Sequence, residues 1–118
     1  MLFIEYPRCT TCQKARRWLE AQKTAFEARH IQQDPPTAQE LKTWHAISGL
    51  PLKRFFNTSG LKYKELWLKD KLPAMSQEEQ YALLASDGML VKRPILVLDH
   101  TVLVGFRQPE WEAALRKN

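Results

Sequence analysis

The amino-acid sequence predicts an α/β fold with a four-stranded mixed sheet, in the order β-α-β, a helical insertion and β-β-α. Two observations predict it. Near the N-terminus, two short segments of β-forming residues flank an amphipathic segment, which is the pattern of two parallel strands joined by a crossover helix. Near the C-terminus, two adjacent β-forming segments precede another amphipathic segment, which indicates a hairpin followed by a helix. We expect a single domain over residues 1–118, with the helical insertion at about residues 34–90.

Three consecutive segments predict the N-terminal βαβ unit. Residues 2–6 are rich in β-forming side chains and end at a proline, which favours a strand. Ala15, Trp18 and Leu19 then place apolar side chains at i, i+3 and i+4 among charged residues, as on a surface helix. Residues 25–31 alternate in polarity, which predicts a second strand parallel to the first.

The central part of the chain is predicted to be helical. Thr37 and Ser76 are each followed three residues later by Glu, which is the capping-box pattern of a helix start. Gly49 is the expected C-cap of the first helix, and Gly88 lies beyond the expected end of the second. Residues 50–72 mix bulky apolar residues with Lys in no clean period, so we expect short helical turns there. The expected buried faces are Leu41, Trp44 and Ile47 in the first helix and Tyr81, Leu83 and Leu84 in the second.

The last two strands are expected at residues 94–98 and 101–104, joined by a short turn at Asp99 and His100. The final helix follows, with Pro109 at its first position, where the missing N–H of proline costs no helical hydrogen bond. Its expected buried face is Trp111, Ala114 and Leu115.

Composition and charge narrow the class of protein. A chain of 118 residues, 44% of them hydrophobic, buries enough surface to fold without disulfides or a metal. No apolar run approaches the roughly 20 residues that span a bilayer, so we expect no membrane association and a cytoplasmic location. We also expect a monomer.

The net charge of +5 is concentrated in residues 49–73. An acidic protein, an anionic small molecule or nucleic acid would suit such a surface, and a solvated face without a ligand explains it equally well. No basic recognition helix of the usual DNA-binding motifs is evident, so we expect no direct DNA binding.

Cys9 and Cys12 carry the clearest chemical signal, because this C-x-x-C motif lies where the first strand passes into the first helix. A thiol at a helix N-terminus faces unpaired N–H groups and the positive end of the helix dipole, both of which favour the thiolate. We expect Cys9, at the mouth of the loop, to be the attacking thiolate and Cys12, one turn into the helix, to be the resolving thiol that closes a Cys9–Cys12 disulfide. Nearby positive charge comes from Arg8, Lys14, Arg16 and Arg17.

Two alternatives stay open for this pair. In a reducing compartment, two cysteines three positions apart suit a redox pair or a metal site better than a structural bridge. A zinc site needs four ligands, and the further candidates His30, His45 and His100 show no paired spacing, so we expect no metal. The other alternative is two small apolar side chains in the core.

Arg93 and Pro94 form a second candidate element of the site. Proline cannot donate a hydrogen bond to a sheet, so here it either begins the strand or makes a cis turn, and the residue before it is displayed away from the sheet. Arg93 is therefore expected to face the thiol loop. The alternative is a surface Arg before a strand-starting Pro.

Three motifs, in this order, resemble the arsenate reductase (ArsC)/Spx/MgsR family along essentially the whole chain. They are Cys9-x-x-Cys12 after the first strand, Arg-Pro-Ile at residues 93–95 and Val-Gly-Phe at residues 104–106. The resemblance implies a thioredoxin-like fold with an inserted helical subdomain, a reactive Cys9 and a cis Pro94.

The arsenate reductase branch of the family implies one function. Its members hold arsenate with three arginines and use glutathione and glutaredoxin, or thioredoxin, as reductant. Arg93 and Arg107 match two of these arginines, and Asn57 stands at the position of the third. A neutral amide weakens the charge-assisted binding of an oxyanion. The resemblance thus implies a thiol–disulfide oxidoreductase using Cys9 and Cys12, acting on a small oxyanion or a protein disulfide, with arsenate reduction in doubt.

The Spx-like branch implies a different function. Its members keep C-x-x-C as a redox switch and bind the C-terminal domain of the α-subunit of RNA polymerase, and Cys9, Cys12 and Gly49 fit that pattern. The alternative function is therefore a redox-sensing transcriptional regulator. Arg93 and Arg107 favour an anion or peptide substrate, whereas the cysteine pair serves either function.

Overall fold

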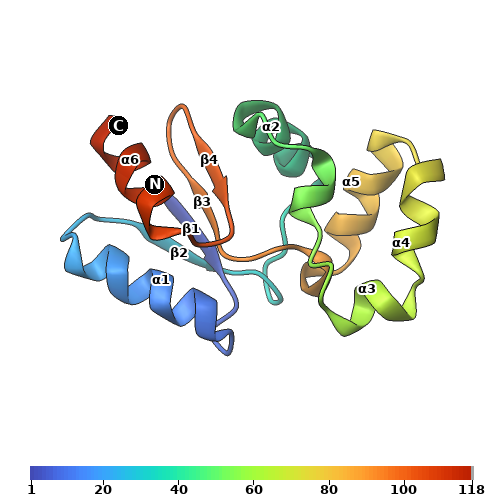
Figure 1. The fold of residues 1–118 in the computed structure, drawn as a ribbon, viewed down its shortest axis with the longest axis horizontal. Coiled ribbons are helices and arrows are strands. Elements are labelled where there is room, and N and C mark those ends of the chain that lie inside the picture. The colour runs from blue at the N-terminus through green and yellow to red at the C-terminus, as the bar shows by residue number, and fades with distance from the viewer. Residues whose placement is uncertain (118) are drawn as a thin grey trace.

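The computed structural model describes residues 1–117 and has the predicted α/β architecture (Figure 1). Its four strands are β1 (Leu2–Glu5), β2 (Glu27–His30), β3 (Ile95–Val97) and β4 (Val102–Val104), in the sheet order β2-β1-β3-β4. β1 is parallel to β2 and antiparallel to β3, and β3 is antiparallel to β4. The predicted mixed sheet, with a βαβ unit and a hairpin, is therefore confirmed.

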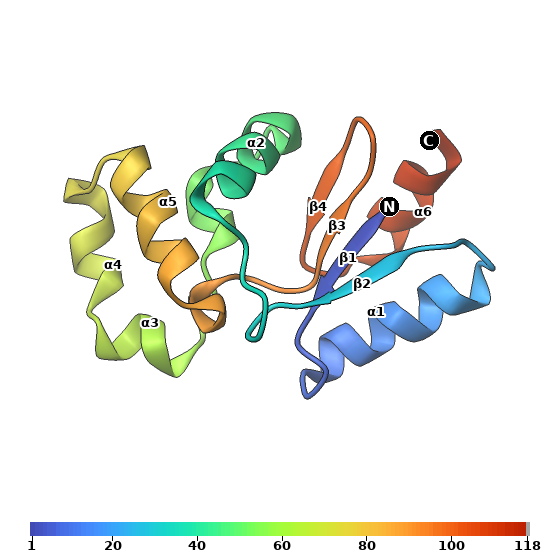
Figure 2. The same cartoon turned by 180° about the vertical axis from the view of Figure 1, so that it is seen from behind.

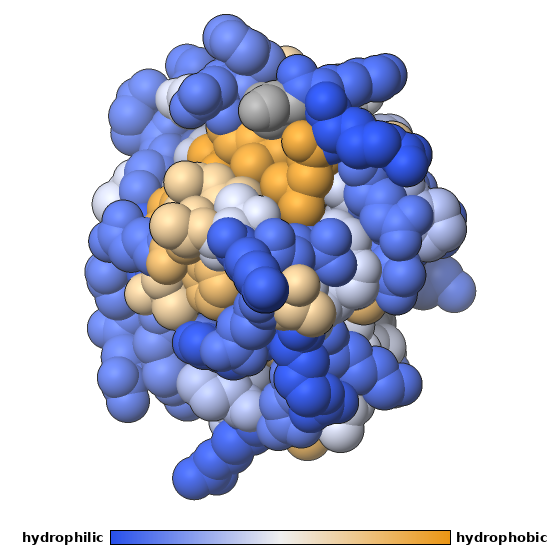
Figure 3. Space-filling model, turned by 90° about the vertical axis from the view of Figure 1, so that its left-hand side faces the viewer, coloured by the Kyte–Doolittle hydropathy of each residue, from blue (hydrophilic) through white to orange (hydrophobic). Residues whose placement is uncertain are grey.

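Two helices pack on one face of the sheet. α1 (Thr10–Ala21) connects β1 to β2, and α6 (Gln108–Lys117) follows β4. Partly buried side chains, among them Trp18 and Phe26, surround the apolar core between these helices and the sheet. Figure 3 shows apolar surface at this end of the molecule, bordered by hydrophilic side chains. Burial of apolar surface, worth about 25 cal/mol per Å², holds these helices on the sheet. The core between them consists of Phe3, Ala15, Leu19, Leu96, Leu98, Trp111 and Ala114.

The opposite face of the sheet shares a second core with the helices between β2 and β3. These helices are α2 (Ala38–Ser48), α3 (Leu61–Glu65), α4 (Leu68–Lys71) and α5 (Gln77–Ser86). Figure 2 shows α3, α4 and α5 at the end of the molecule away from α1 and α6, with α2 between them and the sheet. Short 3-10 turns link them: η1 (Leu52–Phe55), η2 (Leu72–Ala74) and η3 (Gly88–Leu90). The second core includes Ile4, Leu41, Phe55, Leu84, Ile95 and Val104.

The predicted starts and ends of the central helices are confirmed. Thr37 Oγ1 accepts the N–H of Glu40 and Ser76 Oγ accepts the N–H of Glu79, each at 3.1 Å, and both Glu side chains complete a capping box. Gly49 ends α2 with φ +69°, a left-handed conformation that glycine adopts without a steric penalty.

Gly88 lies beyond the end of α5, as predicted: it follows the C-cap residue Asp87 and is the first residue of η3. A Cβ atom at this position would lie 1.9 Å from the carbonyl oxygen of Ile31, so the close approach of two backbones requires this glycine. Two details of the predicted helices are wrong. Ile47 is 40% exposed, because the core-facing side of α2 ends one turn earlier. Pro109 is the second residue of α6.

Candidate active site around Cys9

Cys9 is the N-cap residue of α1, in the loop that follows β1. Its backbone N–H donates to the carbonyl oxygen of Tyr6 at 2.9 Å, and its carbonyl oxygen accepts the N–H of Gln13 at 3.0 Å. These bonds fix Cys9 at the first turn of the helix, where it is half-buried. Cys12 lies one turn further, fully buried, and both cysteines are free thiols.

The pKa of Cys9 is lowered from its ordinary value. Partial burial raises it, but the backbone N–H of Cys12 together with the Cys12 thiol, the backbone N–H of Thr11 and the positive charge of Arg93 outweigh that effect. Two of these influences are N–H groups that the helix start leaves without intrahelical partners. The expected helix-terminus activation of Cys9 is thus supported by the geometry.

The pKa of Cys12 moves the other way. Burial raises the pKa of this thiol to about 12, and the negative charge of a Cys9 thiolate adds to the effect. The lowered pKa of Cys9 favours its thiolate, whereas the raised pKa of Cys12 keeps that thiol protonated at neutral pH.

Arg93, not the basic residues of α1, supplies the positive charge that acts on Cys9. Its guanidinium carbon lies 5.3 Å from the centre of the Tyr6 ring, and its Nη1 donates to the carbonyl oxygen of Met89 at 3.3 Å. The peptide bond between Arg93 and Pro94 is cis, as the resemblance implied. Among the four cations close to Cys9 in sequence, Arg16 instead binds the buried carboxylate of Glu5.

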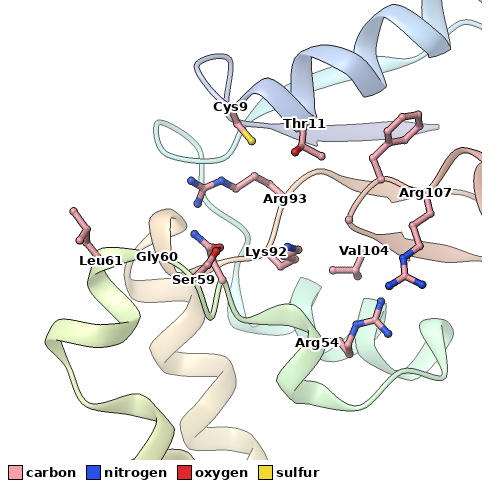
Figure 4. Close-up of a pocket in the computed structure, with 13 residues that line it drawn as sticks. Cys9, Thr11, Arg54, Ser59, Gly60, Leu61, Lys92, Arg93, Val104 and Arg107 are labelled. Carbon is pink, nitrogen blue, oxygen red and sulfur yellow. The ribbon is translucent and has the colours of Figure 1, made fainter.

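Cys9 opens into a pocket of about 740 Å³ (Figure 4). The pocket brings together all three residues predicted to bind an anion, Asn57, Arg93 and Arg107. None of the 13 lining residues is acidic, so the pocket is strongly electropositive. Its lining consists of Cys9, Thr11, Arg54, Asn57, Ser59, Gly60, Leu61, Lys92, Arg93, Val104, Gly105, Phe106 and Arg107.

The loop after η1 holds Asn57 in this pocket. The N–H of Asn57 donates to the carbonyl oxygen of Leu90 at 2.7 Å, and its Oδ1 accepts the hydroxyl of Ser59 at 3.3 Å. A Cβ at Gly60 would lie 2.6 Å from Asn57 Nδ2, so the glycine leaves room for the amide. Asn57 therefore occupies a defined place in the site.

Two cations of the pocket were not predicted from the sequence. Arg54, from η1, and Lys92, beside Arg93, line it together with Arg93 and Arg107. The pocket lining therefore has four cations, two more than the sequence indicated. Arg54 belongs to the basic stretch noted in the sequence, but η1 has no periodicity from which the direction of its side chain follows.

Comparison with known proteins identifies the family. Residues 4–114 match the model described as the ArsC family. The chain belongs to the ArsC family. Within the described part of this ArsC-family chain, none of the helices has the length and apolar character that a bilayer crossing requires, and no three His, Cys, Asp or Glu side chains cluster as metal ligands would.

Proteins similar to this ArsC-family chain include an uncharacterized protein, a regulatory protein and a possible arsenate reductase. It is 51% identical over 112 residues to the uncharacterized protein YusI of Bacillus subtilis (strain 168), which covers 95% of each chain. It is 31% identical over 110 residues to the regulatory protein MgsR of the same organism, covering 93% of this chain and 86% of MgsR. The crystal structure of a possible arsenate reductase from Streptococcus mutans UA159 superposes with a TM-score of 0.87 at 44% identity, covering 94% of this chain and 96% of the other.

Proposed function

We propose that this chain is a thiol–disulfide oxidoreductase in which Cys9 is the attacking thiolate and Cys12 the resolving thiol. The observation that carries the proposal is the opposite shift of two thiols one helical turn apart: the pKa of Cys9 is lowered, and that of Cys12 is raised to about 12. Thiol exchange needs this asymmetry, because the attacking sulfur must be ionised while the resolving sulfur stays unreactive until a mixed disulfide exists.

The proposed reaction consists of two exchanges. The Cys9 thiolate attacks one sulfur of a disulfide, the substrate S–S bond breaks, and one half leaves as a thiolate. Cys12 then loses its proton and attacks the Cys9 sulfur, which forms the Cys9–Cys12 disulfide and releases the other half. Two electrons pass to the substrate, and glutathione with glutaredoxin, or thioredoxin, restores the dithiol.

The order of these exchanges has a physical basis in the pair itself. The negative charge of Cys9 is one of the influences that raise the pKa of Cys12. Formation of the mixed disulfide removes that charge, so the pKa of Cys12 falls when its attack is needed. Cys12 is thereby proposed to become reactive only after the first exchange.

Trapping the mixed disulfide tests this proposal. In Cys12→Ser, we expect Cys9 to stay bound to half of a disulfide substrate, and we expect Cys9→Ser to form no adduct. Intact-protein mass spectrometry after mixing with a neutral aromatic disulfide detects the adduct. An adduct on Cys12 in Cys9→Ser, at the rate seen for Cys9 in Cys12→Ser, would refute the assigned roles.

A redox-sensing regulator is the second candidate, favoured by the similarity to the regulatory protein MgsR. In this proposal the Cys9–Cys12 disulfide is a switch, and the surface around Gly49 contacts the C-terminal domain of the α-subunit of RNA polymerase. Apart from its immediate chain neighbours, no heavy atom lies within 4 Å of the Cβ position at Gly49, which supports an open surface there. Co-purification with RNA polymerase, together with no disulfide turnover, would replace the enzyme by the regulator.

A further inference from the structure

Arg54 and Arg107 form a second group of positive charge in the pocket, apart from Cys9. Arg54 comes from η1 and Arg107 from the loop between β4 and α6, and both line the pocket into which Cys9 opens. Figure 4 shows their guanidinium groups pointing toward each other, at the end of the pocket away from Cys9. The charge that acts on Cys9 belongs to Arg93. Besides Lys92, the pocket therefore has the Cys9 sulfur with Arg93 at one end and two arginines at the other.

The charge of this arginine pair is largely uncompensated. No carboxylate of residues 1–117 forms an ion pair with Arg54. Arg107 Nη1 lies 3.8 Å from a carboxylate oxygen of Glu110, but these side chains are 72% and 52% exposed. Two guanidinium groups that face each other repel unless an anion lies between them, and an exposed ion pair on one of them offsets little of this repulsion. An arginine fork matches a carboxylate with two parallel hydrogen bonds.

The size of the pocket indicates what kind of anion it takes. Its volume of about 740 Å³ lies within the range of about 300–1,000 Å³ in which protein pockets hold organic molecules. Val104 and Phe106 add apolar lining to the polar groups. Such a space suits an organic molecule that extends from the sulfur to the arginine pair better than a lone tetrahedral oxyanion.

We propose that Arg54 and Arg107 bind a carboxylate of a low-molecular-weight disulfide whose S–S bond lies against Cys9. This inference rests on the proposed oxidoreductase function and names its substrate class. The carboxylate is not consumed: the Cys9–sulfur bond forms as the substrate S–S bond breaks, and the departing thiolate takes a proton from water. Arg54 and Arg107 hold the substrate so that one of its sulfur atoms meets the thiolate.

The test compares one disulfide with and without its carboxylates. Glutathione disulfide and the disulfide of glutathione diethyl ester have the same sulfur chemistry, and the ester, in which both the glycine and the γ-glutamyl carboxylates are esterified, lacks the negative charge of all of them. In single-turnover mixing of the reduced protein, we expect Arg54→Ala to slow the reaction with the free acid about tenfold and to slow the reaction with the ester by less than about twofold. Arg107→Ala is expected to behave in the same way.

Lys53→Ala is the matched control, because Lys53 lies on the same 3-10 turn but does not line the Cys9 pocket. It removes the same charge and is expected to change neither rate by more than about twofold. Equal slowing of acid and ester in Arg54→Ala, or equal effects of Arg54→Ala and Lys53→Ala, would overturn the inference. Dithiodipyridine, which is neutral, separates the two claims: if Cys9 reacts with it normally the proposed function stands whatever Arg54 does, and if Cys9 does not react the proposed function itself fails.

Discussion

Arg93 lies beside Cys9 because two contacts from different parts of the chain hold it. The ring of Tyr6 lies under its guanidinium, and the carbonyl oxygen of Met89 accepts one of its N–H groups. The side chain that helps to ionise Cys9 therefore depends on an aromatic residue in the loop that carries Cys9. Tyr6 is a positioning residue in this arrangement.

Replacement of Tyr6 by leucine is expected to raise the pKa of Cys9, because Arg93 loses its ring contact and spends less time near the sulfur. A cation–π contact at a partly exposed site is worth about 0.5–1 kcal/mol, so we expect iodoacetamide to alkylate Cys9 about threefold more slowly at neutral pH. Tyr6→Phe keeps the ring and should leave the rate unchanged. The same slowing in both variants would assign the effect to the hydroxyl and exclude the ring contact.

Asn57 gives the residue-scale test of arsenate chemistry. An arsenate at Cys9 would meet Arg93 and a neutral amide, because Arg54 and Arg107 point toward each other at the far end of the pocket. We expect weak or no arsenate reduction by the wild type with glutathione and glutaredoxin, and an increase of about tenfold or more in Asn57→Arg, since a charge-assisted contact is worth about 1.5–3 kcal/mol. Asn57→Gln is the uncharged control. Efficient arsenate turnover by the wild type would contradict this expectation.

At the scale of elements, two glycines are required for different reasons: Gly88 for the close packing of two backbones and Gly49 for its left-handed conformation. A Cβ at Gly88 would meet the backbone of Ile31, whereas Gly49 has a left-handed φ and open space around its Cβ position. We expect Gly88→Ala to lower the free energy of unfolding by about 3 kcal/mol and Gly49→Ala to lower it by about 1 kcal/mol. Chemical denaturation measures both. An equal loss in the two variants would contradict the packing role of Gly88.

Elements with local signals were predictable from the sequence. The capping boxes at Thr37 and Ser76 depend on side chains three residues apart, and the hairpin depends on two adjacent β-forming segments. The cysteine pair was likewise placed correctly at the start of α1. Arg54 was not predicted as a pocket residue, because its position depends on how η1 packs against segments far away in the chain. The exposure of Ile47 was missed for the same reason, since periodicity shows a face but not where its contact ends.

At the scale of the whole molecule, the buried Cys12 links stability to pH. Its pKa of about 12 in the folded protein lies above the value of about 8.5 for an exposed thiol, so above about pH 8.5 the unfolded chain ionises while the folded chain does not. Stability is therefore lost as pH rises, by up to about 1.4 kcal/mol per pH unit from this group. We expect the free energy of unfolding of Cys12→Ala to fall less steeply between about pH 8.5 and about pH 10 than that of the wild type. Parallel curves would contradict the raised pKa.

The central claim is that Cys9 ionises at a lower pH than Cys12, and the pH dependence of alkylation tests it most directly. Mass spectrometry of the iodoacetamide-labelled peptides of the native protein gives both rates in one experiment. We predict that the labelling rate of Cys9 reaches half its maximum at a lower pH than that of an exposed cysteine in a short peptide, and that Cys12 is labelled only after unfolding. Equal labelling of Cys9 and Cys12 from about pH 5 to about pH 9 would contradict the account.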